Sequence, residues 1–253
     1  VFHEASSEAD TAVKYDHTID LRRFGRVQSG ANATVSSIDY DAVSPFGSDS
    51  PFFQMPDANP FAVKQRFSAL HAGAYAQGTR AVAPRLDVTA GARLDRYDFI
   101  SATRISPRLA AEFAMSPRLS IRTSFGQYFQ QPFYLFLTAY PQNRSLKPFR
   151  ADHYVGGVRF DLNAATRVGV EAYRKNYRDY PVSSQIPSLS LANVGDTFAV
   201  RDTLFPMVSD GRGVVTGVEA SAERKLPPGG RWRGETNLSF SRARYAGADG
   251  VLR

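Results

Sequence analysis

The sequence predicts an all-β protein, an antiparallel transmembrane β-barrel, and three observations lead to this prediction. Apolar and polar residues alternate with a period of two along many segments, as expected for strands with one apolar and one polar face. These segments run about 11–14 residues, which exceeds the usual soluble strand and suits a tilted membrane strand. Short and long connections alternate along the chain, which is typical of barrels with short turns at one end and long loops at the other.

The composition agrees with this class and excludes others. The 253 residues have a mean hydropathy of −0.31, and no stretch approaches the roughly 18 apolar residues of a membrane helix. The absence of cysteine excludes disulfides, Cys-ligated zinc and thiol catalysis. The net charge is +7, but Lys and Arg are spread without a run of five, which favours a mixed-sign surface over a nucleic-acid interface.

The alternation predicts about nine strands. In the clearest segment, 86–95, the residues Leu86, Val88, Ala90, Ala92 and Leu94 share one face. Six further segments begin near residues 105, 119, 151, 166, 213 and 231, and two less regular ones lie near 12–24 and 65–82.

The connections predict an orientation. Tight turns are expected at 83–85, 116–118, 163–165 and 227–230, and long loops at 26–64, 130–150 and 179–212, with one shorter connection at 99–104. With the turns in the periplasm, the strands at 86, 119, 166 and 231 run outward, and so does 12–24. An odd number of strands cannot close an even-stranded barrel. We therefore expect residues 1–253 to be a partial outer-membrane β-barrel domain.

Aromatic residues mark the predicted strand ends. Trp232 follows a turn, and Tyr97, Tyr128, Tyr177 and Tyr245 lie near the outer ends. These positions are consistent with two aromatic girdles at the membrane surfaces.

A series of short motifs between about residues 70 and 240 resembles the TonB-dependent outer-membrane receptor family. They are Tyr75-Ala76-Gln77, Pro84-Arg85-Leu86, Gly91-Ala92-Arg93-Leu94-Asp95, Ser116-Pro117-Arg118-Leu119, Leu146-Lys147-Pro148 and Gly217-Val218-Glu219. Phe149, Gly78 and Val155 depart from the family pattern. The resemblance implies a 22-stranded barrel, closed by an N-terminal plug domain that couples to TonB. We expect that plug domain to be absent from this chain.

No catalytic or metal constellation is visible, and no cofactor is expected. The four His residues are scattered, with no i, i+4 pair and no associated carboxylates. No nucleophile elbow or phosphate loop occurs, so the protein is not expected to be an enzyme. Glu219 and Glu223 share one strand face, and we expect them to pair with Arg on neighbouring strands.

The predicted outer loops hold the candidate ligand-binding residues. They are aromatic or basic: Phe52, Phe53, Tyr128, Phe133, Tyr134, Tyr140 and Arg144. Exposed aromatic clusters usually mark recognition surfaces. The alternative is that the run 133–137 packs a folded loop on itself.

The sequence therefore predicts a TonB-dependent receptor in the outer membrane of a Gram-negative bacterium. Its expected role is energy-coupled uptake of a scarce nutrient, such as a ferric siderophore. Its expected partners are outer-membrane lipid, the extracellular ligand and, through the plug, the TonB–ExbB–ExbD complex; it would act as a monomer without nucleic acid. The alternative is a surface barrel that binds or anchors other envelope proteins without transport.

Overall fold

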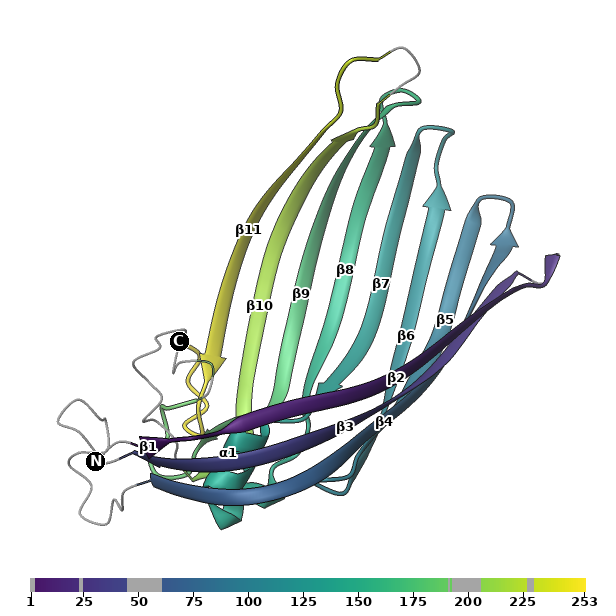
Figure 1. Cartoon of the computed structure of the whole chain (residues 1–253). Coiled ribbons are helices and arrows are strands. Elements are labelled where there is room, and N and C mark those ends of the chain that lie inside the picture. Colours follow the sequence, from purple (N-terminus) through teal and green to yellow (C-terminus); the bar gives the residue numbers. More distant parts are fainter. Residues whose placement is uncertain (1–2, 23–24, 45–60, 191, 193–205, 227–229) are drawn as a thin grey trace.

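The computed structural model describes residues 3–22, 25–44, 61–190, 192, 206–226 and 230–253. Within these residues, eleven strands form a single antiparallel sheet that curves strongly (Figure 1). The strands are β1 (His3–Glu4), β2 (Ser7–Asp20), β3 (Arg26–Ser44), β4 (Phe61–Ala83), β5 (Leu86–Tyr97), β6 (Ala102–Ala114), β7 (Leu119–Gln130), β8 (Phe149–Asp161), β9 (Thr166–Ser183), β10 (Met207–Arg224) and β11 (Gly234–Ala246). Each strand from β3 to β10 pairs with the next one in sequence, and β1 and β2 both pair with β3. This is the meander expected of an up-and-down barrel wall.

The prediction of a loop over residues 26–64 was wrong, because it hid the strand β3. β2 pairs directly with β3, with Asp20 opposite Arg26, and next to this pair the Leu21 N–H donates to the Gly25 carbonyl at 2.8 Å. Gly25 adopts φ +97. A Cβ on Gly25 would lie 2.1 Å from the carbonyl oxygen of Thr79, so only glycine fits here. Of the nine outward positions of β3, four are Ala or Ser and two are Asp, so the strand has few apolar side chains larger than Ala to mark its alternation.

The extra strand changes the count and the direction of β2. The described sheet has ten long strands rather than nine, besides the short β1. Because the end of β2 pairs with the start of β3, it runs toward the short turns and not outward as predicted. The long strands of the described sheet therefore number ten, an even number, where the sequence predicted nine.

The other predicted connections are confirmed in position where the structure describes them, whereas residues 227–229 of the predicted turn 227–230 and residues 191 and 193–205 of the predicted loop 179–212 lie outside the described residues. Tight turns join β4 to β5, β6 to β7 and β8 to β9, and they lie at the same end of the sheet as the end of β10 (Figure 1). We call this the turn end. The connection 131–148 and the short 98–101 turn lie at the opposite end, which we call the loop end, as do the end of β9 and the start of β10. Among the described residues, no helix is long and apolar enough to cross a membrane.

The register aligns apolar side chains into rows on one face of the sheet, the apolar face. One row holds Phe113, Ile121, Val158, Val170, Ala220 and Leu238, and the next toward the loop end holds Ala111, Thr123, Gly156, Ala172, Val218 and Phe240. Most of the large members of these rows are exposed. Tyr154 on β8 and Leu162, directly after its end, bound the band, and their eight-residue separation spans about 26 Å along the chain at ~3.3 Å per residue. With a tilt of roughly 40° this gives a height of about 20 Å between the two Cα atoms, which approaches the ~25 Å apolar band of a membrane barrel.

The opposite, polar face is held together by cross-strand hydrogen bonds and ion pairs. Glu112 on β6 binds Arg122 on β7 at 3.0 Å and Arg159 on β8 at 2.7 Å. Further pairs join Arg167 to Asp161 at 2.7 Å, Tyr75 to Asp16 at 2.8 Å, Gln77 to Gln28 at 2.7 Å and Ser36 to Asp10 at 2.6 Å. Buried or half-buried polar groups need such partners.

The predicted pairing of Glu219 and Glu223 with arginines is not found among the described residues. Glu223 lies directly opposite Arg167, but the Arg167 guanidinium binds Asp161 instead. Glu219 faces another carboxylate, Glu171, across the strand pair.

The four tyrosines predicted for the outer girdle lie on the polar face. Tyr97 is buried there, stacks on His71 at 4.7 Å and donates a hydrogen bond to the Phe129 carbonyl at 3.0 Å. The rings that bound the apolar band at the loop end are instead Phe125 and Tyr154, 5.2 Å apart. At the turn end Trp232 is exposed, with the Arg224 guanidinium 4.5 Å above its ring. That position agrees with the predicted girdle.

Candidate ligand-binding mouth

The connection 131–148, which we call the mouth segment, folds back over the polar face at the loop end. It contains the helix α1 (Tyr134–Ala139) and the short 3-10 helix η2 (Pro141–Ser145). Helix α1 lies beside β3 and β4 rather than beside the strands it connects (Figure 1). Its half-buried side chains pack on buried Ile38, Tyr40 and Val63. The segment therefore bridges strands that are far apart in the sheet.

A buried asparagine ties the mouth segment to β10. The Asn143 side-chain amide donates to the Phe136 carbonyl at 2.8 Å, and its carbonyl oxygen accepts from the Met207 backbone N–H at 2.7 Å. Leu137, Leu146 and Met207 form a buried apolar cluster around it. These contacts fix the segment in one position, as buried polar groups with satisfied partners do.

An aromatic and basic cluster lies where the mouth segment meets the wall. Phe67 stacks on Phe99 at 4.6 Å, and Tyr134 meets both rings edge-on at 5.8 Å and 5.2 Å. The guanidinium carbon of Arg144 lies 4.0 Å above the Phe99 ring. Arg144 is otherwise exposed. A guanidinium held against a ring keeps its N–H edges free to bind oxygen atoms of an anionic ligand.

A second group lies on the adjacent strands. Tyr128 is partly exposed, contacts the His153 ring at 4.5 Å and carries the Arg108 guanidinium 4.9 Å above its own ring. Arg108 and Tyr128 therefore form a second pair of a cation and an accessible aromatic ring on the polar face.

The sequence did not lead us to predict a site at a third group of aromatic residues. Phe149, Tyr177, Tyr180 and Tyr245 form a cluster with ring centroids 5.2–6.4 Å apart. The signal was present in the alternation, since Tyr177 and Tyr245 fall on the polar set of their strands. Their closeness depends on the register of β9, β10 and β11.

Below the mouth, a polar network occupies β3, β4 and β5. Buried Asp95 accepts hydrogen bonds from Arg93 at 2.7 Å and pairs with His71 at 3.0 Å, while Arg93 also donates to Asn32 at 2.7 Å. His71 is thus a partnered histidine. Among the described residues, no group of three or more His, Asp or Glu could hold a metal ion.

The predicted ligand-binding residues fall into three groups. Phe133 and Tyr128 are exposed, at 67% and 38%, and Arg144 is exposed above Phe99. Tyr134 and Tyr140 are half-buried against the wall, and burial raises the pKa of the Tyr140 phenol, which keeps its hydroxyl protonated. Phe52 and Phe53 lie outside the described residues. Within the run 133–137, Leu137 is fully buried, as expected of a loop that packs on itself, and Phe133 is exposed. A role of these residues in ligand binding stays a prediction.

A curved antiparallel sheet with an apolar band outside and a polar, ion-paired face inside defines the wall of a membrane β-barrel. The chain matches the family model described as TonB dependent receptor-like, beta-barrel, over residues 3–251, and it belongs to that family. The members of this family are outer-membrane receptors and transporters of Gram-negative bacteria, not enzymes. No curated protein sequence was found to match the chain.

Solved structures share the fold at low identity. The FrpB iron transporter from Neisseria meningitidis (F3-3 variant) aligns with a TM-score of 0.66 and 14% identity, over 96% of this chain and 36% of that one. The siderophore receptor PirA from Pseudomonas aeruginosa gives 0.62 and 15%, over 95% and 42%. A mutant ferric enterobactin receptor from Pseudomonas aeruginosa, in complex with enterobactin, gives 0.62 and 15%, over 93% and 36%. The chain therefore spans well under half the length of these proteins.

Proposed function

We propose that the chain forms part of an energy-coupled outer-membrane receptor that takes up a large, scarce nutrient, most simply a ferric siderophore. The observation that carries this proposal is Arg144 held 4.0 Å above Phe99 beside Tyr134 at the loop end. Ferric siderophores expose anionic oxygens and flat rings, which suit a guanidinium beside stacked aromatics. The iron and siderophore receptors among the structural relatives support the same ligand class.

The proposal includes a plug domain and the TonB complex as partners. Glu171 and Glu219 face each other without ion-pair partners in the described part of the polar face. Such carboxylates are suited to bind basic side chains of a domain inside the barrel. The full-length protein should then contain a plug and a TonB-contacting segment, and a full-length sequence without both would contradict transport.

The ligand-binding part is tested with full-length protein and a panel of ferric siderophores, including ferric enterobactin. Arg144→Ala should weaken binding of the recognised siderophore by about 2- to 30-fold, the range of ~0.5–2 kcal/mol for a cation–π contact. Lys147→Ala is the matched control, because Lys147 is exposed on the same segment and only reaches Asp179 at 3.8 Å. Equal affinities of wild type and Arg144→Ala for the siderophore would show that the mouth segment is not part of the ligand-binding site.

The location has its own test. Full-length protein should sediment with outer membranes and change its gel mobility on boiling, as closed barrels do. Recovery as soluble protein with no heat-modifiable band would contradict the proposed function as a whole.

A further inference from the structure

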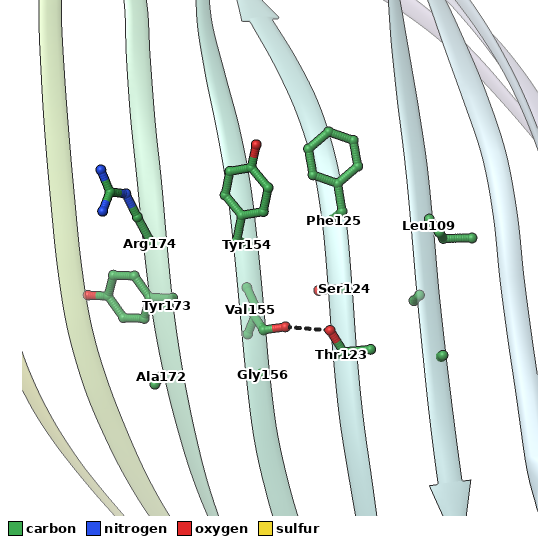
Figure 2. Close-up of a pocket in the computed structure, with 12 residues that line it drawn as sticks. Leu109, Thr123, Ser124, Phe125, Tyr154, Val155, Gly156, Ala172, Tyr173 and Arg174 are labelled. Atoms are coloured by element: carbon green, nitrogen blue, oxygen red, sulfur yellow. Dashed lines mark hydrogen bonds between the residues drawn. The ribbon is translucent and has the colours of Figure 1, made fainter.

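An open groove crosses the apolar face between β6 and β9. Its floor is the row of small residues Ala111, Thr123, Gly156 and Ala172, and larger side chains of the next row, Leu109, Phe125 and Tyr154, form its loop-end wall (Figure 2). The groove has a volume of about 610 Å³. That is within the usual range of ligand sites.

The floor of the groove is apolar and has room above it. The Thr123 hydroxyl donates to the Val155 carbonyl at 3.2 Å, so its polar group is already satisfied by the sheet (Figure 2). A Cβ placed on Gly156 would meet no atom within 4 Å. The space is wide enough for an extended hydrocarbon chain lying against the strands.

Arginines line the loop-end edge of the same face. Arg174 lies beside Tyr154 and lines the groove, and Arg242 and Arg244 follow on β11, opposite Thr216 and Val214. We call Arg174, Arg242 and Arg244 the arginine row. All three are exposed, and within the described residues none forms an ion pair. Arg174 uses only its Nε, which donates to the Asn176 side chain at 2.9 Å.

The placement of the arginine row distinguishes it from the other charges of the wall. On the polar face Arg122, Arg159 and Arg167 bind carboxylates of their own sheet. The arginine row instead lies at the boundary where the apolar rows give way to Gln127, Asp152 and Asn176. In a membrane, unpaired guanidinium groups at this depth attract anionic headgroups.

We propose that the groove and the arginine row together bind a phosphorylated membrane lipid, with one acyl chain along the floor and the phosphate on the guanidinium groups of Arg174 and Arg242. The inference rests on the proposed location in a membrane. The parallel N–H groups of an arginine guanidinium can donate hydrogen bonds to two phosphate oxygens at once. A lipid fits this surface better than a second copy of the chain, because the three positive charges of the arginine row would repel the same row on another copy.

The first experiment tests the headgroup. Full-length, delipidated protein in neutral detergent is titrated with fluorescent phosphatidic acid, and with phosphatidylcholine and diacylglycerol carrying the same chains. Phosphatidic acid should bind most tightly. The double variant Arg174→Gln, Arg242→Gln should weaken its binding about 25-fold, from roughly fivefold per arginine. Arg80→Gln is the matched control, because Arg80 is also exposed and on the apolar face, but near the turn end; it should bind as the wild type does.

The second experiment tests the groove. Gly156→Leu places a side chain in the space that the acyl chain would occupy, and it should reduce phosphatidic acid binding at least fivefold. Gly78→Leu is its control, since a Cβ on Gly78 also meets no atom within 4 Å, yet Gly78 lies on β4, away from the groove. Both proteins should keep their heat-modifiable mobility.

The outcomes separate this inference from the proposed function. Equal binding of phosphatidic acid and diacylglycerol, or wild-type affinity in both the arginine and the Gly156 variants, overturns the lipid site while leaving the receptor reading intact. If the arginine variant does not fold, the headgroup comparison on wild-type protein and the Gly156→Leu arm still decide. Binding of a second protein copy in place of lipid, seen as a lipid-independent dimer lost in Gly156→Leu, also overturns it.

Discussion

The wall and the mouth segment are stabilised in different ways. Along the wall, each strand binds its neighbours through continuous backbone ladders, and its large apolar side chains remain exposed on one face. The mouth segment has only one short helix and a 3-10 turn, and it depends on buried side chains such as Leu137, Asn143 and Met207. The wall is therefore stabilised by backbone pairing, while the mouth segment is stabilised by a small buried core of its own.

This difference separates stability from specificity. Residues on the apolar face can change among apolar types with little effect, because surrounding lipid fills the space they leave. Residues under the mouth segment have no such substitute, since any space left there is closed inside protein. The mouth can therefore be changed locally while the wall persists.

The largest expected effect concerns the mouth core. Leu137→Ala should destabilise the mouth segment by about 2–5 kcal/mol, because Leu137 is fully buried and its loss leaves a cavity. Leu94→Ala on the apolar face, where Leu94 is 48% exposed, should cost under about 1 kcal/mol. Hydrogen exchange of the backbone amides at 134–146 measures the first effect, and the thermal midpoint of the barrel measures the second. Equal effects at the two leucines would contradict the distinction between wall and mouth.

The next effect tests a turn of the wall. Gly25→Ala should destabilise the β2–β3 hairpin by about 1–3 kcal/mol, because alanine is strained at φ +97 and its Cβ would meet the Thr79 carbonyl. Gly250→Ala is the comparison, since Gly250 also has a positive φ, of +70, but no atom near its Cβ. Thermal unfolding of full-length protein should show a larger shift for Gly25→Ala. A larger shift for Gly250→Ala would mean that the close approach at Gly25 is not tight.

The same contrast explains how much of the structure the sequence revealed. Period-2 alternation was sufficient for β5–β11, because each strand carries large apolar residues on one set of positions. It failed for β3, whose outward positions are small or polar except for Val27, Val35 and Val43. These valines are widely spaced, so the segment was interpreted as a loop.

The mouth was less accessible to such reasoning. The sequence identified Tyr134 and Arg144 as candidates, but not Phe67 and Phe99, which lie on other elements and meet them only through the folded segment. No local period encodes a contact between helix α1 and β4. Tertiary packing of a loop depends on residues that are distant in sequence, and alternation reports only on neighbours.

A smaller effect tests the polar face of the wall. Glu112→Gln removes the carboxylate that Arg122 and Arg159 share and should destabilise the barrel by about 1 kcal/mol, since the three groups are partly exposed. Glu223→Gln is the matched control on the same face, because Glu223 forms no ion pair within the described residues: Arg167 opposite it binds Asp161. The thermal midpoint should fall for Glu112→Gln only, and the difference should shrink at high salt. A drop of the same size for Glu223→Gln would show that the net charge of the polar face, and not pairing, sets the stability.

The smallest effect concerns the turn end of the apolar face. Trp232→Ala removes the ring under the Arg224 guanidinium, 4.5 Å away, and should destabilise the protein in lipid by about 0.5–1 kcal/mol. Trp232→Phe should recover part of that loss, because a smaller ring still offers its face to the cation. Arg224 also donates to the Thr166 hydroxyl at 3.2 Å, so it stays anchored in both variants and the comparison isolates the ring. The measurement is the thermal midpoint in lipid vesicles and in neutral detergent. If Trp232 serves as an interfacial anchor as well as a cation partner, the loss will be larger in vesicles than in detergent; an equal loss in both would confine its role to the contact with Arg224.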